Sequence, residues 1–342
     1  MRFPWSRLAR FLSVLSVAAL VVGLVSCSSD SEKSDALLIY NAQHESLTKE
    51  WIDAFTKETG IKVEYRQGGD TELGNQLIAE GASSPADVFL TENSPAMAAV
   101  EKAGLFADVD AATIAQVPAQ YRPATNKWTG VAARTTVFAY NKNKLTEAQL
   151  PKSIMELEQP EWKGRWGAPP VKPDFQAIVA AMLQLTGEPA TAQWLAGMKT
   201  GAEIFSDNIA TLRAVNDGQV SGGVIYHYYW FRDQAETKEI SANTALHYFK
   251  NEDPGAFVSI SGGGILNSSK KKDQAQKFLT FITSKAGQEV LENGTSFEYP
   301  VASGVPANKA LVPLDQLEAP AVNPSDLDSQ KVTDLMTKAG LL

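Results

Sequence analysis

Two periods of apolar residues follow one another in the first third of the chain. Short apolar segments of strand type lie at 37–40, 61–65 and 87–90. Each is followed by a stretch in which apolar residues recur at helical spacing, and these stretches end near Gly60, Gly81 and Gly104. Strand and helix thus alternate three times, which predicts an α/β fold with parallel strands and right-handed crossovers.

The pattern after Gly104 is less regular and predicts a second lobe. Strands are expected at 136–140 and 220–225, and a strand interrupted by glycines at 257–266. Helices are expected at 177–185, 194–198, 209–215, 273–282 and 329–340.

The predicted strand 220–225 runs into a dense aromatic cluster, residues 226–231. Tyr228 and Tyr229 are adjacent, so their hydroxyl groups can point to one place only near a junction between a strand and a helix. An aromatic patch in the core is the ordinary explanation for such a cluster.

Two other polar residues follow predicted strands in the same way, His44 after 37–40 and Glu92 after 87–90. In sheets of this type ligands bind beyond the carboxyl ends of the strands. Taken singly, His44 is a surface or capping residue and Glu92 a favourable charge in the first turn of a helix. Taken together with Tyr228 and Tyr229, they offer one nitrogen and three hard oxygen ligands, a set that suits Fe³⁺ better than Zn²⁺ or Ca²⁺ and leaves copper open.

The N-terminus predicts export. Three arginines precede an apolar run at 11–25 that is too short for a membrane span and typical of a signal peptide, residues 1–26. Leu24 to Cys27 resembles the lipobox of bacterial lipoproteins, so Cys27 is the expected lipidation site and residues 27–35 a tether. The protein is therefore expected on the outer face of the cell membrane, held only by its lipid.

Charge and cysteine content argue against a disulfide-linked protein and against a nucleic-acid-binding protein. Cys27 is the only cysteine, so no disulfide can form within the chain. Without the leader the chain has 28 Lys and Arg against 39 Asp and Glu, a net charge of −11. Nucleic acid is not an expected partner.

Motifs across both predicted lobes resemble those of the periplasmic ferric-iron-binding proteins of bacterial ABC importers, the bacterial-transferrin group. The motifs are Tyr-Asn-Ala-Gln-His44, Ala-Asp-Val-Phe-Leu-Thr-Glu92, Trp-Lys-Gly with Trp166-Gly167, Tyr228-Tyr229-Trp230, Asp253-Pro254-Gly255-Ala256 and Glu298-Tyr299-Pro300. The resemblance implies a two-lobed type II periplasmic-binding-protein fold, with mixed sheets flanked by helices and a ligand cleft between the lobes. One lobe would comprise 36–134 and 259–309, the other 136–258 and 310–342.

The resemblance also implies the site. His44 and Glu92 from one lobe and Tyr228 and Tyr229 from the other would hold Fe³⁺, with carbonate, phosphate or water completing its coordination. The anion contacts implied are Arg134, Asn208 and Asn93. Lys172, which the family pattern does not supply, is a further candidate that would provide charge to another anion, and a purely structural salt bridge is the alternative for Arg134. The chain departs from the family at Val171-Lys172-Pro173-Asp174, where Pro173 has no backbone N–H to donate to phosphate, and at Tyr226, which replaces an asparagine.

The expected function is therefore the capture of ferric iron, or of a small ferric chelate, by a monomer that delivers it to an ABC importer permease. A receptor for a small organic anion or phosphonate on the same fold is an alternative, in which Arg134 and Lys172 would grip the ligand. A secreted hydrolase is a further alternative, but the chain has no Gly-x-Ser-x-Gly or His-Glu-x-x-His motif and only three histidines. No catalysis is expected.

Overall fold

The structure is a computed structural model that describes residues 35–342. Residues from Ala36 to Leu342 form one compact unit. The predicted signal peptide, Cys27 and the tether up to residue 34 lie outside the described residues. Within the described part, no helix has the length and apolar character to cross a membrane.

A nine-stranded mixed sheet runs through the unit, in the order β2-β1-β3-β9-β4-β7-β5-β6, with β8 paired to β4. The strands are β1 (Leu37–Asn41), β2 (Val63–Gln67), β3 (Val88–Leu90), β4 (Trp128–Asn141), β5 (Trp166–Ala168), β6 (Glu203–Ile204), β7 (Gly222–Tyr226), β8 (Thr244–His247) and β9 (Val258–Ile265). β1 is parallel to both β2 and β3, which confirms the predicted parallel pairing, whereas β9 is antiparallel to β3.

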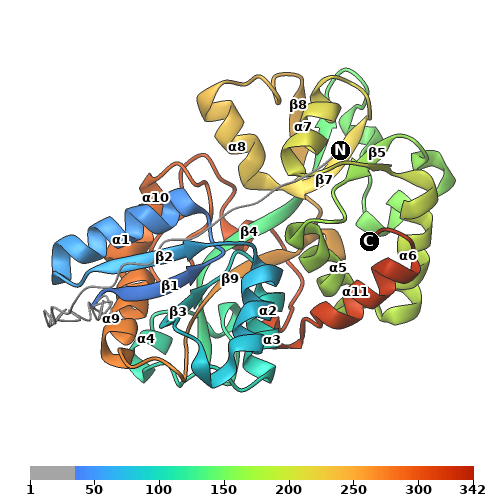
Figure 1. The fold of residues 1–342 in the computed structure, drawn as a ribbon. Coiled ribbons are helices and arrows are strands. Elements are labelled where there is room, and N and C mark those ends of the chain that lie inside the picture. Colours follow the sequence, from blue (N-terminus) through green and yellow to red (C-terminus); the bar gives the residue numbers. More distant parts are fainter. Residues whose placement is uncertain (1–34) are drawn as a thin grey trace, which may run out of the picture. The chain divides into compact units, whose positions relative to one another are not determined.

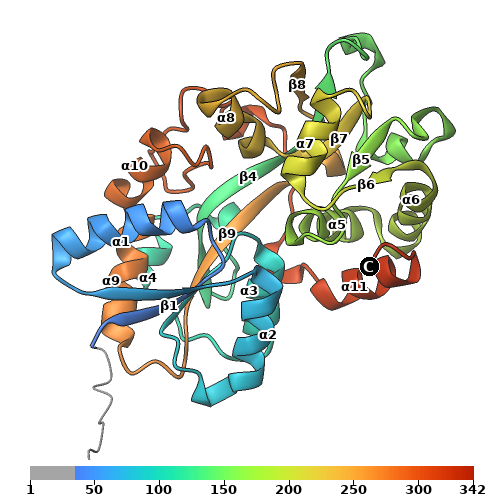
Figure 2. The same cartoon turned by 45° about the horizontal axis from the view of Figure 1, so that its top comes forward.

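Helices cover both faces of the first half of the sheet (Figures 1 and 2). The helices are α1 (Glu45–Thr59), α2 (Asp70–Glu80), α3 (Ser94–Lys102), α4 (Ala111–Ile114), α9 (Lys272–Thr283) and α10 (Lys285–Asn293). Because successive side chains of a strand point to opposite faces, Ile39 packs with α1 and α9, while its neighbour Tyr40 packs with α2 and α3. The predicted alternation of strand and helix therefore positions three loops at one edge of the sheet.

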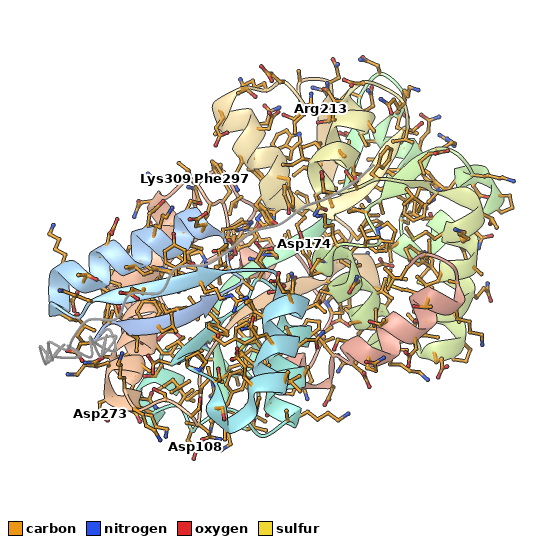
Figure 3. All side chains as sticks on the ribbon, viewed as in Figure 1. Asp108, Asp174, Arg213, Asp273, Phe297 and Lys309 are labelled. Atoms are coloured by element: carbon orange, nitrogen blue, oxygen red, sulfur yellow. The ribbon has the colours of Figure 1, made fainter. Side chains whose placement is uncertain are left out.

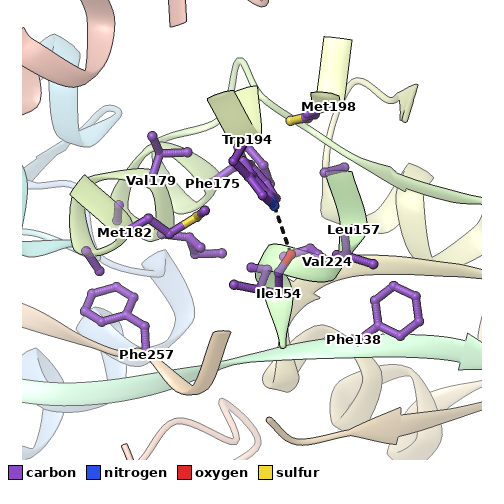
Figure 4. Close-up of a cluster of buried hydrophobic side chains, with 14 of the residues drawn as sticks. Phe138, Ile154, Leu157, Phe175, Val179, Met182, Trp194, Met198, Val224 and Phe257 are labelled. Carbon is purple, nitrogen blue, oxygen red and sulfur yellow. Dashed lines mark hydrogen bonds between the residues drawn. The ribbon is translucent and has the colours of Figure 1, made fainter. Parts of the chain in front are cut away.

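The second half of the sheet has a core of its own. Its helices are α5 (Pro173–Thr186), α6 (Glu188–Gly201), α7 (Asn208–Asn216), α8 (His227–Glu236) and α11 (Ser329–Lys338). α5 and α6 bury aromatic side chains such as Phe175 and Trp194 against β7, and the Trp194 indole N–H donates to the Ile154 carbonyl at 2.9 Å (Figure 4). Ile225 faces the opposite side, toward α7 and α8.

Two strands differ from the sequence prediction. The strand expected at 136–140 is the last part of the 14-residue β4, all of which is buried, and β4 pairs with both β7 and β9. The glycines expected to interrupt the strand at 257–266 do not do so, and β9 is continuous. These glycines lie where the sheet is crowded: a Cβ on Gly264 would lie 2.6 Å from the Phe106 ring. Helix α10 was not predicted.

Candidate metal centre

The four predicted ligands all follow strand ends, as expected. His44 is the residue before α1 and comes shortly after β1, and Glu92 lies between β3 and α3. β7 ends at Tyr226 and α8 begins at His227, so Tyr228 and Tyr229 occupy the first turn of α8. The predicted junction between strand and helix is therefore confirmed.

The structure brings these four side chains together. His44 Nε2 lies 3.2 Å from Glu92 Oε1. The His44 ring meets the Tyr228 ring edge to face, with 4.8 Å between ring centroids, and the Tyr228 and Tyr229 rings are 4.2 Å apart. Imidazole, carboxylate and two phenols thus converge from three loops that are far apart in the sequence.

Asp174 lies beside the tyrosine pair, near the N-terminus of α5, and is labelled in Figure 3. Its side chain is only 4% exposed. Both tyrosine hydroxyl groups donate to Asp174 Oδ2, Tyr228 at 3.3 Å and Tyr229 at 3.1 Å. A carboxylate therefore already occupies the space that the two phenols face.

Two residues predicted to contact an exogenous anion bind this carboxylate instead. Asn208 Nδ2 donates to Asp174 Oδ2 at 2.9 Å, and Asn93 Nδ2 donates to Asp174 Oδ1 at 2.9 Å. The same Asn93 amide donates to Asp70 Oδ2 at 3.0 Å, and Asp70 Oδ1 accepts from the backbone N–H of Glu92 at 2.9 Å. Asn93 thus ties Asp174 to the loop that carries Glu92.

The other two predicted anion contacts behave differently. Arg134 is fully buried, forms a short ion pair with Glu298, and has its guanidinium 5.7 Å from the centre of the Tyr228 ring. Its Nε and Nη1 atoms have no hydrogen-bond partner among the described residues. Lys172 is exposed at the start of α5, and its side chain makes no hydrogen bond or ion pair in the described part of the chain. The structure does not bring Lys172 into the cluster.

The two residues before the tyrosine pair, Tyr226 and His227, form hydrogen bonds with groups outside the pair. The His227 ring accepts a hydrogen bond at Nδ1 from the Thr135 backbone N–H at 3.2 Å and stacks on Tyr299. Burial lowers the pKa of His227 to about 3, so its ring is neutral. Tyr226 is buried and donates to Asn93 Oδ1 at 3.3 Å, which supports the asparagine that binds Asp174.

Burial dominates the electrostatics of the site and favours bound protons. It raises the pKa of Tyr228 and of Tyr229 well above the usual phenol value, and the charge of Asp174 adds to both shifts. Burial also raises the pKa of Glu92 to about 8, although the charge of His44 opposes this. For His44 burial acts in the lowering direction, but Glu92 and Glu298 outweigh it and the pKa of His44 is raised.

The sequence analysis did not assign roles to Asp174, Asp70 and Glu298. Asp174 follows the carboxyl end of β5, so the rule that found Glu92 would also have found it. Asp70 begins α2 after β2 in the same way. Glu298 follows no strand, and only its place in the Glu-Tyr-Pro motif marked it.

The oxygen-rich donor set of this site is suited to a hard, highly charged cation. Among residues 35–342, no group of three or more His, Cys, Asp and Glu side chains could hold a metal ion. The phenol oxygens of Tyr228 and Tyr229 lie beside Asp174, and as ligands they suit a cation that can displace their protons.

Comparisons with known proteins identify the family. A family model described as bacterial extracellular solute-binding protein matches residues 83–326. The chain belongs to this family of solute-binding proteins. It is 56% identical to the Fe(3+)-binding periplasmic protein of Serratia marcescens over 342 residues, which cover 100% of both chains. It is 35% identical to the major ferric iron-binding protein of Neisseria meningitidis serogroup B over 308 residues, 89% of this chain and 93% of the relative.

A solved structure gives the same result. The crystal structure of iron-bound HitA from Pseudomonas aeruginosa superposes with a TM-score of 0.85 at 40% identity, covering 90% of this chain and 99% of HitA. This solute-binding protein therefore has the two-lobed α/β fold of type II periplasmic binding proteins, with a mixed sheet and flanking helices. It is a binding protein and not an enzyme.

Proposed function

We propose that this protein captures ferric iron in the cleft between its lobes and delivers it to the permease of an ABC importer. The observation that carries the proposal is the convergence of His44, Glu92, Tyr228 and Tyr229 on one point. The Serratia and Neisseria relatives are ferric-iron-binding proteins, which supports the choice of cargo.

Asp174 is proposed as a fifth protein ligand. Its Oδ2 atom accepts hydrogen bonds from both phenols. When iron displaces those protons, the two phenolate oxygens and the Asp174 oxygen can face the metal together. Asn93 and Asn208 then hold this built-in carboxylate in place of carbonate or phosphate, which leaves water or a small anion for the remaining position.

Iron capture and lobe closure are proposed to be one event. The proposed lobes are 36–134 with 259–309 and 136–258 with 310–342, so His44 and Glu92 lie on one and the tyrosines and Asp174 on the other. Separate hydrophobic cores in the two halves of the sheet support this division. A metal that binds ligands of both lobes stabilises the closed form, which is the form that a permease can distinguish.

The cellular setting follows from the N-terminal sequence. We propose that Cys27 carries a lipid and that the mature monomer is held on the outer face of the cell membrane through this lipid alone. The word periplasmic in the name of the Serratia relative supports an extracytoplasmic location. The cargo is free ferric iron or a small ferric chelate.

Metal analysis of the purified protein, together with its visible spectrum, tests the proposal. Iron-loaded protein should show a phenolate-to-iron charge-transfer band in the visible region. Tyr228→Phe and Tyr229→Phe should each weaken or abolish the band and lower iron affinity, because each removes one phenolate ligand. Tyr65→Phe is the matched control, since the Tyr65 hydroxyl group donates to Glu45 at the surface. Iron-loaded protein without colour, or a band that survives both substitutions, would refute phenolate ligation.

A further inference from the structure

Glu298 is a fully buried carboxylate at the Nδ1 end of the His44 ring, opposite the Nε2 end that faces Glu92. Its side chain is 0% exposed. Glu298 Oε1 lies 2.7 Å from His44 Nδ1, while Glu92 Oε1 is 3.2 Å from His44 Nε2 at the other end of the ring. His44 is therefore held between a buried carboxylate and the candidate metal centre.

The second oxygen of Glu298 is surrounded by donors. Arg134 Nη2 forms a short ion pair with Oε2, Gln43 Nε2 donates to it at 3.3 Å, and Ser261 Oγ lies 3.5 Å away. The Gln43 side chain also accepts the His44 backbone N–H at 2.7 Å. Glu298 is thus locked in one orientation, with Oε1 left for the imidazole.

An ionised carboxylate can only accept hydrogen bonds, so the His44 ring must carry its hydrogen on Nδ1. When the ring is neutral, Nε2 then has a free lone pair that points to Glu92 and the tyrosine pair. Ligating histidines commonly donate their other N–H to a carboxylate in this way, which fixes tautomer and ring direction and makes the ligand more basic.

We propose that Glu298 is the positioning residue for His44: it keeps hydrogen on Nδ1 and presents Nε2 to the incoming iron. This inference rests on the proposed function above for the identity of the metal. Glu298 itself touches neither the metal nor the other ligands, and it acts only through His44.

The geometry predicts what Glu298→Gln does. Three donors surround Oε2, so the amide oxygen of the substituted side chain takes that position and its NH₂ group faces His44 Nδ1. Nδ1 must then accept a hydrogen bond, and the hydrogen of the neutral ring moves to Nε2. The atom that should bind iron would carry a hydrogen instead.

The first test is made on the metal-free protein. Two-bond ¹H–¹⁵N correlations distinguish the two tautomers of a neutral imidazole, and wild-type His44 should be in the Nδ1–H form at a pH where the ring is neutral. Glu298→Gln should convert it to the Nε2–H form. A wild-type His44 in the Nε2–H form overturns the proposal without any variant being needed, as does a Glu298→Gln spectrum that matches wild type.

The second test is a double-mutant cycle of affinity, with Fe³⁺ and with the diamagnetic ion Ga³⁺. Glu298→Gln should weaken binding about 10–100-fold, the usual effect of removing an outer-shell partner. In a His44→Ala background the same change should have no further effect, because the partner through which Glu298 acts is gone. An equal loss in both backgrounds would show a general structural role and overturn the proposal.

Glu101→Gln provides the matched control, since the Glu101 carboxylate accepts from Trp128 Nε1 at 2.7 Å and from Ser325 but contacts no proposed ligand. This variant should keep wild-type affinity and the His44 tautomer. The two proposals can be refuted separately. Absence of iron binding by the wild type refutes the proposed function. Iron binding together with a His44 tautomer that is the same in the wild type and in Glu298→Gln refutes the positioning role.

Discussion

At the scale of single residues, one carboxylate changes the interpretation of the site. The family resemblance implies an exogenous anion, with Arg134, Asn208, Asn93 and Lys172 as the candidate contacts. Asn208 and Asn93 instead donate to Asp174, a residue of the chain itself. Pro173 gives this turn no N–H for phosphate, and the next residue, Asp174, is the carboxylate proposed above as a ligand in place of an exogenous anion.

Asp174→Asn tests that interpretation. The substitution keeps the shape of the side chain but removes its charge, so iron affinity in carbonate-free and phosphate-free buffer should fall by at least the 10–100-fold typical of losing an outer-shell partner. Added carbonate or phosphate should restore part of the affinity. Competition against a chelator of known iron affinity provides the measurement.

Lys172→Ala is the control for Asp174→Asn, since Lys172 is exposed beside the same turn. Its iron affinity and its response to added anion should equal those of the wild type. If Asp174→Asn binds iron at wild-type strength without any anion, Asp174 is not a ligand.

The sequence predicts those residues of the site that follow the carboxyl end of a strand. His44, Glu92, Tyr228 and Tyr229 stand where strands end, and the structure brings all of them together. Glu298 could not be found in this way, because its contact with His44 joins positions 254 residues apart and depends on tertiary packing. The sequence alone does not show which charged side chain will be buried, because burial depends on partners that only the fold brings to it.

At the scale of elements, the junction between β7 and α8 positions the tyrosine pair. β7 lies between β4 and β5, so its residues contact two neighbouring strands and the helices on both faces. Gly222 begins this strand against the ring of Phe138, and a Cβ there would lie 2.1 Å from Phe138 Cζ. The absence of a side chain at Gly222 is therefore a packing requirement.

Gly222→Ala should destabilise the metal-free protein by about 1–3 kcal/mol, the usual cost of overpacking a core. It should also lower iron affinity, since the strand that carries α8 must shift. Urea unfolding gives the stability, and chelator competition gives the affinity.

Gly201→Ala in α6 is the matched control for this substitution. Its new Cβ would meet only Lys163 Cα, at 3.8 Å, which is an ordinary contact. Alanine is the better helix former, so this variant should be neutral or more stable by up to about 1 kcal/mol. Equal stability of the two alanine variants would contradict the packing argument.

The spacing of apolar residues predicts those strands and helices that bury one face only. The first three predicted pairs of strand and helix follow the expected periods, and the structure has them at 37–102. β4 and β9 were misjudged because both are buried on both faces and β9 contains three adjacent glycines. β4 has 14 residues and β9 has 8, and the two strands pair with each other over residues 128–135 and 258–264. Local pattern cannot reveal this pairing, because the partners are far apart in the sequence.

At the scale of the whole molecule, iron loading must be coupled to proton release. The pKa values of Tyr228 and Tyr229 are raised far above neutrality by burial and by Asp174, so both phenols hold their protons until a metal displaces them. Glu92, with a pKa raised to about 8, holds a proton as well at neutral pH. A buried cluster of acids thus stores protons that compete with iron.

The sign of the pH dependence follows from this competition. Iron binds the deprotonated ligands, so its affinity should fall as pH falls, by about a factor of 100 per pH unit for the two phenols alone, since each released proton contributes tenfold. Below about pH 8 the slope should steepen, because Glu92 must then lose a proton too. Iron affinity measured by chelator competition between pH 6 and 9, corrected for the chelator's own protonation, gives this slope.

Counting the protons released in unbuffered solution tests the same coupling without a chelator. Iron loading of the wild type should release at least the two phenol protons, and Tyr228→Phe should release one fewer while Tyr65→Phe releases the wild-type number. Release below two protons by the wild type would mean that at least one phenol stays protonated and is no ligand.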